Sequence, residues 1–169
     1  MNNFHQWFKD EYNTLYEVSY PPLTHSRQVL TGGHLGGKLA DGSFTKRGLS
    51  LPLYLDSAQR LNHHLTMHHT IEERHIFPAL ATKMKEFSND SEHLKSHRGI
   101  HDGMDKVQEL VNRWKKEPAS YSPEEMRACL DSFREVLFNH LDQEVADLKG
   151  ENLKKYWTLE EIEKMNLVD

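Results

Sequence analysis

The sequence predicts an all-α fold: an up-down-up-down four-helix bundle with a long loop between the first two helices and a short C-terminal helix. Three observations predict it. Apolar residues recur at steps of three and four over four stretches, helix start signals precede the later stretches, and the last three stretches have short connections. Because 169 residues suit one domain, we expect a single domain over residues 1–169.

The first helix is expected over residues 3–19. Its inner face carries residues at steps of three and four, namely His5, Phe8, Tyr12, Leu15 and Ser19. Residues 20–50 follow with two prolines and six of the nine glycines, so they predict a loop. Such a long loop is uncommon in a compact domain. A short helix over residues 23–30, ended by Gly32 and Gly33, would shorten it.

The second helix is expected over residues 51–84. Its inner face continues at steps of three and four through Tyr54, Ala58, Leu61, Leu65, His68, Glu72, Ile76 and Ala79. Pro78 has no backbone N–H, so it should kink the helix or shorten its last turns.

The third helix is expected to start after a polar stretch at residues 88–91. It should end at Lys115 and Lys116, where the helix dipole favours basic side chains. Its inner face reads Leu94, His97, His101, Met104, Val107, Val111 and Trp114.

Two capping boxes predict the last two helices. Ser122 and Glu125 form one box, with Pro123 at the first helical position, and the helix they start should end near Gly150. Its inner face reads Met126, Leu130, Phe133, Leu137, His140, Glu144 and Leu148. Thr158 and Glu161 form the second box, which opens a short terminal helix.

Composition excludes several classes of protein. The net charge is −5 with mixed signs along the chain, which argues against nucleic-acid binding because that needs a basic surface. The longest apolar run is eight residues, too short for a membrane span. No signal peptide is visible, and the lone Cys129 fits a reducing compartment. We expect a cytoplasmic location, with the nucleus as the alternative, and the sequence does not identify a protein partner.

Histidine is the unusual component, with 12 in 169 residues. Three pairs spaced four apart lie on the inner faces, so each pair can present two ligands to one point: His68/Glu72, His97/His101 and His140/Glu144. The pairs of the third and fourth helices lie at similar distances from the turn that joins those helices. His68/Glu72 and His5 can reach the same layer, so all four helices can converge on it.

Such a layer favours bound cations. Burying several imidazoles and two carboxylates costs several kcal/mol per charged group unless a cation compensates. Nitrogen and oxygen ligands without thiolate suit iron, manganese or zinc, and seven ligands are too many for one tetrahedral zinc.

The ligand number can be compared with that of two metal ions. Two octahedral ions offer about twelve positions. Five histidines, two bridging carboxylates and an oxo or hydroxo bridge would fill about eleven, which leaves one position for a small molecule such as dioxygen. Without His5 a second position opens, and oxygen activation or peroxide chemistry becomes easier.

Some ligand assignments have alternatives. His69/Glu73 has the same spacing as His68/Glu72, but the inner face through Leu61 and Leu65 favours the latter. His5 could equally be a solvated residue of its helix. Four further histidines are expected at the surface or behind the ligands: His63, His64, His75 and His93.

Three motifs together resemble the hemerythrin-like HHE cation-binding family. They are residues 64–78 (HLTMHHTIEERHIFP), residues 97–103 (HRGIHDG) and residues 138–145 (FNHLDQEV), and residues 155–161 (KYWTLEE) are similar to the tail of the fungal branch. The resemblance covers roughly residues 52–165. It implies a four-helix bundle with a non-haem di-iron centre, in which His68, His97, His101 and His140 are terminal ligands and Glu72 and Glu144 are bridges.

The resemblance leaves two points open. It implies a ligand on the first helix but identifies no motif there, so the candidates are His5, His25 and His34. In respiratory hemerythrins an aspartate stands one residue after the position of Glu144, so the behaviour of an oxygen carrier does not transfer directly to this chain.

Three functions are consistent with these observations. The first is a di-iron protein that binds dioxygen or another small ligand, or that stores or senses iron. The second is a di-iron oxidoreductase acting on peroxide, nitric oxide or oxygen. The third is a regulatory or interaction module that changes with metal occupancy.

Overall fold

The computed structural model describes residues 2–18 and 49–165. Four long helices make up most of this part: α1 (Asn2–Val18), α3 (Leu51–Ile71), α5 (Glu92–Lys116) and α6 (Pro123–Asp147). Within these residues there is no strand, so the prediction of an all-α helical bundle is confirmed. The predicted helix over 23–30 and nearly all of the predicted loop over 20–50 lie outside the described residues.

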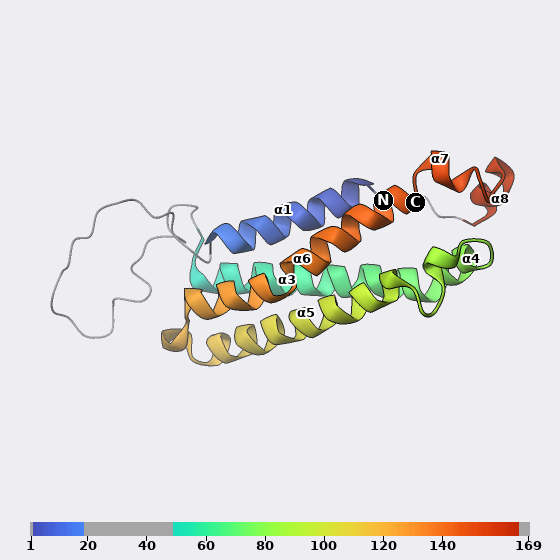
Figure 1. Ribbon diagram of the computed structural model, residues 1–169. Helices are drawn as coiled ribbons and strands as arrows, with labels where there is room; N and C mark the ends of the chain where they lie inside the picture. The colour runs from blue at the N-terminus through green and yellow to red at the C-terminus, as the bar shows by residue number, and fades with distance from the viewer. Residues whose placement is uncertain (1, 19–48, 166–169) are drawn as a thin grey trace, which may run out of the picture.

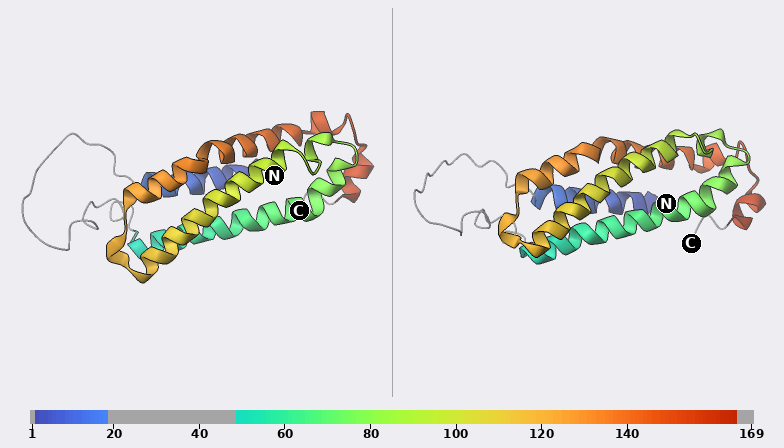
Figure 2. Two further views of the ribbon diagram at one scale, coloured as in Figure 1. Left: turned by 60° about the horizontal axis from the view of Figure 1, so that its bottom comes forward. Right: turned by 90° about the horizontal axis from the view of Figure 1, so that it is seen from below.

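The four long helices form a ring of neighbours. α1 packs against α3 and α6, and α5 packs against α3 and α6. Successive long helices point in opposite directions in Figure 1, and two further views show them side by side (Figure 2). None of the helices in the described part of the chain combines the length and apolar character needed to span a bilayer.

The predicted helix over residues 51–84 is divided in three. α3 ends at Ile71, a π-helical segment covers Glu72–Ile76, and α4 covers Phe77–Ala81. The backbone N–H of Phe77 donates to the carbonyl of Glu72, five residues back. Pro78 explains this change. In a regular α-helix the carbonyl of Arg74 would accept from the N–H of residue 78, but proline has no N–H and its ring crowds that carbonyl. The wider turn accommodates the ring without ending the helix.

In the described part of the chain, short elements connect the later long helices and follow α6. Lys85–Phe87 and Pro118–Ser120 form single 3₁₀ turns, and two short helices follow α6: α7 (Gly150–Leu153) and α8 (Leu159–Lys164). The capping box of Thr158 and Glu161 is complete. At α6 only half of the predicted box forms: the Ser122 hydroxyl accepts from the Glu125 N–H, but the Glu125 carboxylate pairs with Arg113 instead.

Apolar side chains form two clusters at different heights in the bundle. The larger one fills the ring of long helices with residues such as Tyr12, Leu65 and Phe133. The smaller one includes Phe77, Leu80 and Phe87, and α7 and α8 pack on it. Along the chain, four predicted metal ligands lie between residues of the two clusters: His68, Glu72, His97 and Glu144. His101 and His140 lie beside residues of the larger cluster. The packing therefore places a polar layer inside an otherwise apolar interior.

Candidate metal centre

Two groups of buried side chains could each hold a metal ion. We call His69, Glu72, His97 and His140 subsite I, and His5, His68, Glu72 and Glu144 subsite II. Within each group, one nitrogen or oxygen atom per residue lies within 4.8 Å of those of all the others. Glu72 belongs to both groups. The two subsites are therefore neighbours that share a carboxylate.

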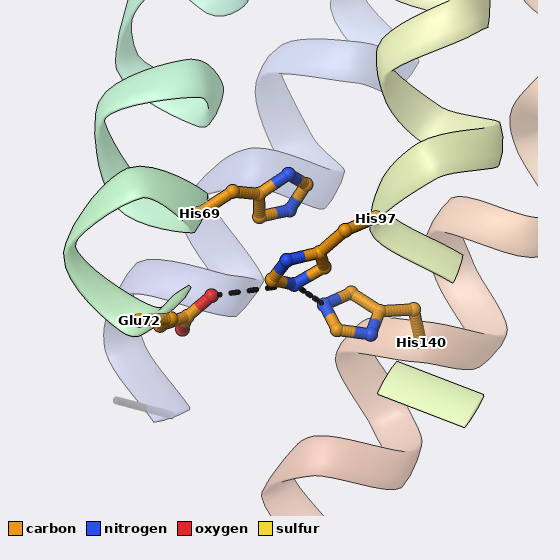
Figure 3. Close-up of side chains that lie close together, drawn as sticks. All are labelled: His69, Glu72, His97 and His140. Atoms are coloured by element: carbon orange, nitrogen blue, oxygen red, sulfur yellow. Dashed lines mark hydrogen bonds and ion pairs between the residues drawn. The ribbon is translucent and has the colours of Figure 1, made fainter. Parts of the chain in front are cut away.

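Subsite I is built from four helical segments. His69 extends from α3 and Glu72 from the π-helical segment, while His97 lies on α5 and His140 on α6 (Figure 3). Nε2 of His97 lies 3.0 Å from Nε2 of His140 and 3.5 Å from Oε2 of Glu72. The His69 ring stacks on the His97 ring with centroids 3.8 Å apart.

Subsite II joins α1 to the other helices. Nε2 of His5 lies 3.2 Å from Nε2 of His68 and 3.5 Å from Oε2 of Glu144. Nε2 of His68 lies 2.9 Å from Oε1 of Glu72. His5, one of the three candidates on the first helix, is thus brought to the other predicted ligands. The alternatives His25 and His34 lie outside the described residues.

Both carboxylates face both subsites. Oε1 of Glu72 faces His68 while its Oε2 faces His97. Oε2 of Glu144 lies 3.5 Å from the ring nitrogen of His5 and 3.6 Å from that of His140. This is the arrangement expected of carboxylates that bridge two ions, the role that the family resemblance implies for these two residues.

Unpaired polar atoms support the interpretation that cations belong in this layer. Although His68 approaches Glu72 closely, the contact lacks hydrogen-bond geometry, and no carboxylate oxygen of Glu72 or Glu144 has a hydrogen-bond partner among the described residues. Both ring nitrogens of His69 are also unpaired there. Buried polar atoms without partners are costly. Because these lone pairs converge from several helices, the donor set fits hard or borderline cations.

Burial keeps the ligands uncharged when no metal is bound. It lowers the pKa of His5 to about 4, that of His97 to about 3 and that of His140 to about 2. It raises the pKa of Glu72 to about 8 and that of Glu144 well above its ordinary value. The metal-free layer therefore holds neutral imidazoles and protonated carboxyls near pH 7. The imidazoles are ready to bind a cation, whereas the carboxyls must release protons to do so.

Groups behind the ligands fix some of the rings. Nδ1 of His97 donates to Oε1 of Glu73 at 2.7 Å, and Nδ1 of His5 donates to the carbonyl of Leu141 at 3.1 Å. With Nδ1 protonated, Nε2 carries the lone pair that faces the subsite. The tautomer follows from these partners.

The remaining predicted residues have different positions. His101 is half-buried, belongs to neither subsite, and places its ring edge-on to that of His69 at 5.2 Å. Among the four histidines expected away from the ligands, three are exposed, and His93 is buried with its Nε2 3.0 Å from Oδ2 of Asp147.

Sequence reasoning treated His69 as an alternative to His68, but the structure brings both into the site. The signal was the doubled motif itself, with two histidines followed by two glutamates. Adjacent residues on a helix point about 100° apart. A wide inner face can therefore take both histidines, one toward each subsite.

Comparisons with known proteins agree with this geometry. Residues 24–150 match the family described as hemerythrin HHE cation binding domain. This match covers more than half of the chain, and the chain belongs to that family. The resemblance expected from the three motifs is confirmed at this level.

One similar curated protein is the dimeric xanthone biosynthesis cluster protein R11 of Cryptosporiopsis sp. (strain 8999). It is 34% identical over 97 residues, which are 54% of this chain and 36% of that protein. The chain thus spans about a third of the relative's length. No solved structure shows a significant match to the chain.

Proposed function

We propose that this protein holds two non-haem iron ions and uses them to bind dioxygen or another small ligand, or to store or sense iron. Membership of the family supports cation binding. The observation that carries the proposal is the position of Glu72, whose two oxygens face histidines of different subsites. A single-ion site would not need a carboxylate placed in this way.

The proposed ligands divide between the two ions. His69, His97 and His140 would hold one ion and His5 and His68 the other, with Glu72 and Glu144 shared. His101 stays a prediction from its spacing and the family resemblance, and it is tested by the same measurements. When bound, the ions would supply redox chemistry and a coordination position for a small molecule.

The protonation states and the burial of the chain's own residues suit this site to metal ions and to small neutral molecules. The buried imidazoles stay neutral because burial disfavours their charged form, so Nε2 remains available as a ligand atom. Glu72 and Glu144 hold protons until a cation replaces them. The apolar clusters on either side exclude bulk water, which favours small uncharged ligands over ionic ones.

An oxidoreductase acting on peroxide, nitric oxide or oxygen is the second candidate. It is favoured by the similarity to a protein whose name places it in a biosynthesis cluster. Enzymatic turnover distinguishes it from reversible binding, since a carrier or sensor forms a stable complex and an enzyme consumes its substrate.

Iron loading in the absence of air tests the proposal. The purified protein should take up two ferrous ions per chain, and a charge-transfer absorption band should appear on exposure to air. Reversal of the band on removal of oxygen supports reversible binding, and consumption of oxygen or peroxide supports the second candidate.

Variants give this experiment its controls. His97→Ala should abolish loading at subsite I, whereas His63→Ala, at an exposed position of α3, should load as the natural protein does. His101→Ala tests the predicted ligand that lies outside both subsites. Failure of the natural protein to bind iron, or equal loading in His97→Ala, would contradict the proposal.

A further inference from the structure

A pocket opens beside subsite I on the outer side of the bundle. It has a volume of about 620 Å³ and lies between the start of α5 and the C-terminal half of α6. Its wall includes His93, Ser96, Asn139, His140, Gln143 and Asp147. Because His140 belongs to subsite I, the pocket ends at the candidate metal centre.

The pocket wall carries an excess of acidic groups. Glu86, Asp90, Glu92 and Asp147 line it, and Lys85 is the one lysine or arginine among its lining residues. Several carboxylates around a concave surface concentrate the electric field and raise the local concentration of cations. The wall therefore favours cations over anions.

Two observations inside the pocket point to a metal ion rather than to general acidity. His140 is only 3% exposed, and its Nδ1 has no hydrogen-bond partner among the described residues. On the same wall, Nε2 of His93 and Oδ2 of Asp147 lie 3.0 Å apart, and the two side chains are 4% and 15% exposed. Imidazole and carboxylate together suit divalent iron, manganese or zinc.

The other approach to the centre has a different character. The side chain of His68 is 17% exposed, the largest exposure among the residues of the two subsites. Exposed apolar side chains lie on α3, which carries His68, and on the neighbouring α1, among them Trp7, Met67 and Ile71. Apolar groups offer no ligands to replace the water of a hydrated cation, so this side suits a small neutral molecule better.

We propose that the acidic pocket is the loading route for divalent cations, with His93 and Asp147 as transient ligands ahead of subsite I. This proposal rests on the proposed function, since it assumes that the two subsites bind ions. A hydrated ion would be attracted by the acidic rim and exchange water for His93 and Asp147. It would then pass to subsite I when the His140 ring turns, which is a ligand exchange without a redox step.

Stopped-flow mixing with cobalt(II) alone tests the route. The metal-free protein is mixed with the ion at low salt, and binding is followed by the absorption of the cobalt complex. The rim variant Asp90→Asn with Glu92→Gln should load about three- to tenfold more slowly than the natural protein. Its final number of bound ions and its final spectrum should be unchanged. High salt should remove the difference, because ions screen the rim.

A matched variant controls for net charge. Asp105→Asn with Glu109→Gln removes the same charge from exposed positions of α5 that do not line the pocket, and it should load at the natural rate. Asp147→Asn weakens the transient ligand pair, so it should load more slowly at every salt concentration and still reach the full number of ions.

The outcomes separate this proposal from the one it rests on. If the natural protein binds no cobalt, the proposed function fails. If it binds cobalt but the rim variant loads at the natural rate, or the control slows equally, the route is wrong and the metal centre stands. A lower final number of ions in Asp147→Asn would place Asp147 in the centre itself and also overturn the route.

Discussion

Glu73 lies outside both candidate subsites and contacts one of the proposed ligands, His97. Its Oε1 accepts from Nδ1 of His97 at 2.7 Å, which leaves Nε2 free to face Glu72 and His140. The carboxylate therefore selects the tautomer that can bind a metal and limits rotation of the ring. We treat Glu73 as a positioning residue.

Replacing Glu73 should weaken metal binding without removing it. Glu73→Ala leaves Nδ1 of His97 without its acceptor, so we expect metal affinity to fall about 10- to 100-fold. Glu73→Gln keeps an acceptor oxygen and should recover most of the affinity. Competition with a coloured chelator measures the affinities. Equal affinity in Glu73→Ala and the natural protein would show that the contact does not position His97.

Individual residues also show which candidate ligands could be predicted from the sequence. Spacing on the inner faces indicated His68, Glu72, His97, His140 and Glu144, and the structure brings these residues together. The position of His5 depended on how far α1 overlaps the other helices, which local patterns do not fix. His69 could not be assigned because a wide inner face can take either or both of two adjacent histidines, and the orientation of Glu73 depends on where the helix widens ahead of Pro78.

Among the helices, the π-helical segment lies at the candidate metal centre. It carries Glu72 and Glu73, one in both subsites and the other on His97. The sequence indicated a disturbance by Pro78 but placed it in the last turns. The distortion spreads toward the N-terminus because proline deprives the residue four positions earlier of its partner.

The two glycines of α5 should respond in opposite ways to alanine. A Cβ at Gly103 would lie 2.3 Å from the Phe133 ring on α6, whereas one at Gly99 would meet Val136 at an ordinary 3.8 Å. We expect Gly103→Ala to lower the free energy of unfolding by about 1–3 kcal/mol, and Gly99→Ala to raise it by about 0.5–1 kcal/mol.

Urea unfolding of both glycine variants measures these changes. The pair shares one helix and one substitution, so the difference between them reports the close approach of α5 to α6. If Gly103→Ala were as stable as Gly99→Ala, the packing of Phe133 against the α5 backbone would be wrong.

In the molecule as a whole, a polar layer lies between two apolar clusters. When no metal is bound, the titration of this layer should determine how the free energy of unfolding depends on pH. The unfolded chain protonates histidines below about pH 6.5, whereas folded His97 and His140 stay neutral down to a pKa of about 3 and about 2. Stability from these groups is present above pH 6.5 and is lost as the pH falls.

The buried carboxyls act in the opposite direction. Glu72 keeps its proton up to a pKa of about 8 in the folded protein but loses it near pH 4.5 when unfolded. Its contribution is full below pH 4.5 and is lost as the pH rises toward 8. Five histidines of this layer have a lowered pKa and only two carboxyls have a raised one, so the histidines dominate between pH 4.5 and 6.5. The metal-free protein should therefore be most stable near about pH 6.5.

Urea midpoints of the metal-free protein at about pH 4, 6.5 and 8 measure this dependence. Glu72→Gln should reduce the loss between about pH 6.5 and 8, because the amide does not titrate. Metal affinity should instead increase with rising pH, because the carboxyls must release protons when the metal binds. Stability that rises steadily to pH 8 in the metal-free natural protein would contradict the burial of neutral carboxyls.

The central claim is that two ions lie side by side and share carboxylates inside the bundle. X-ray absorption at the iron edge of the fully loaded protein tests it most directly, because the scattering reports each iron atom's neighbours. We predict a shell of nitrogen and oxygen atoms without sulfur, and scattering from a second iron atom that disappears in Glu72→Ala. Isolated iron atoms in the natural protein, or an iron pair that survives in Glu72→Ala, would contradict the account.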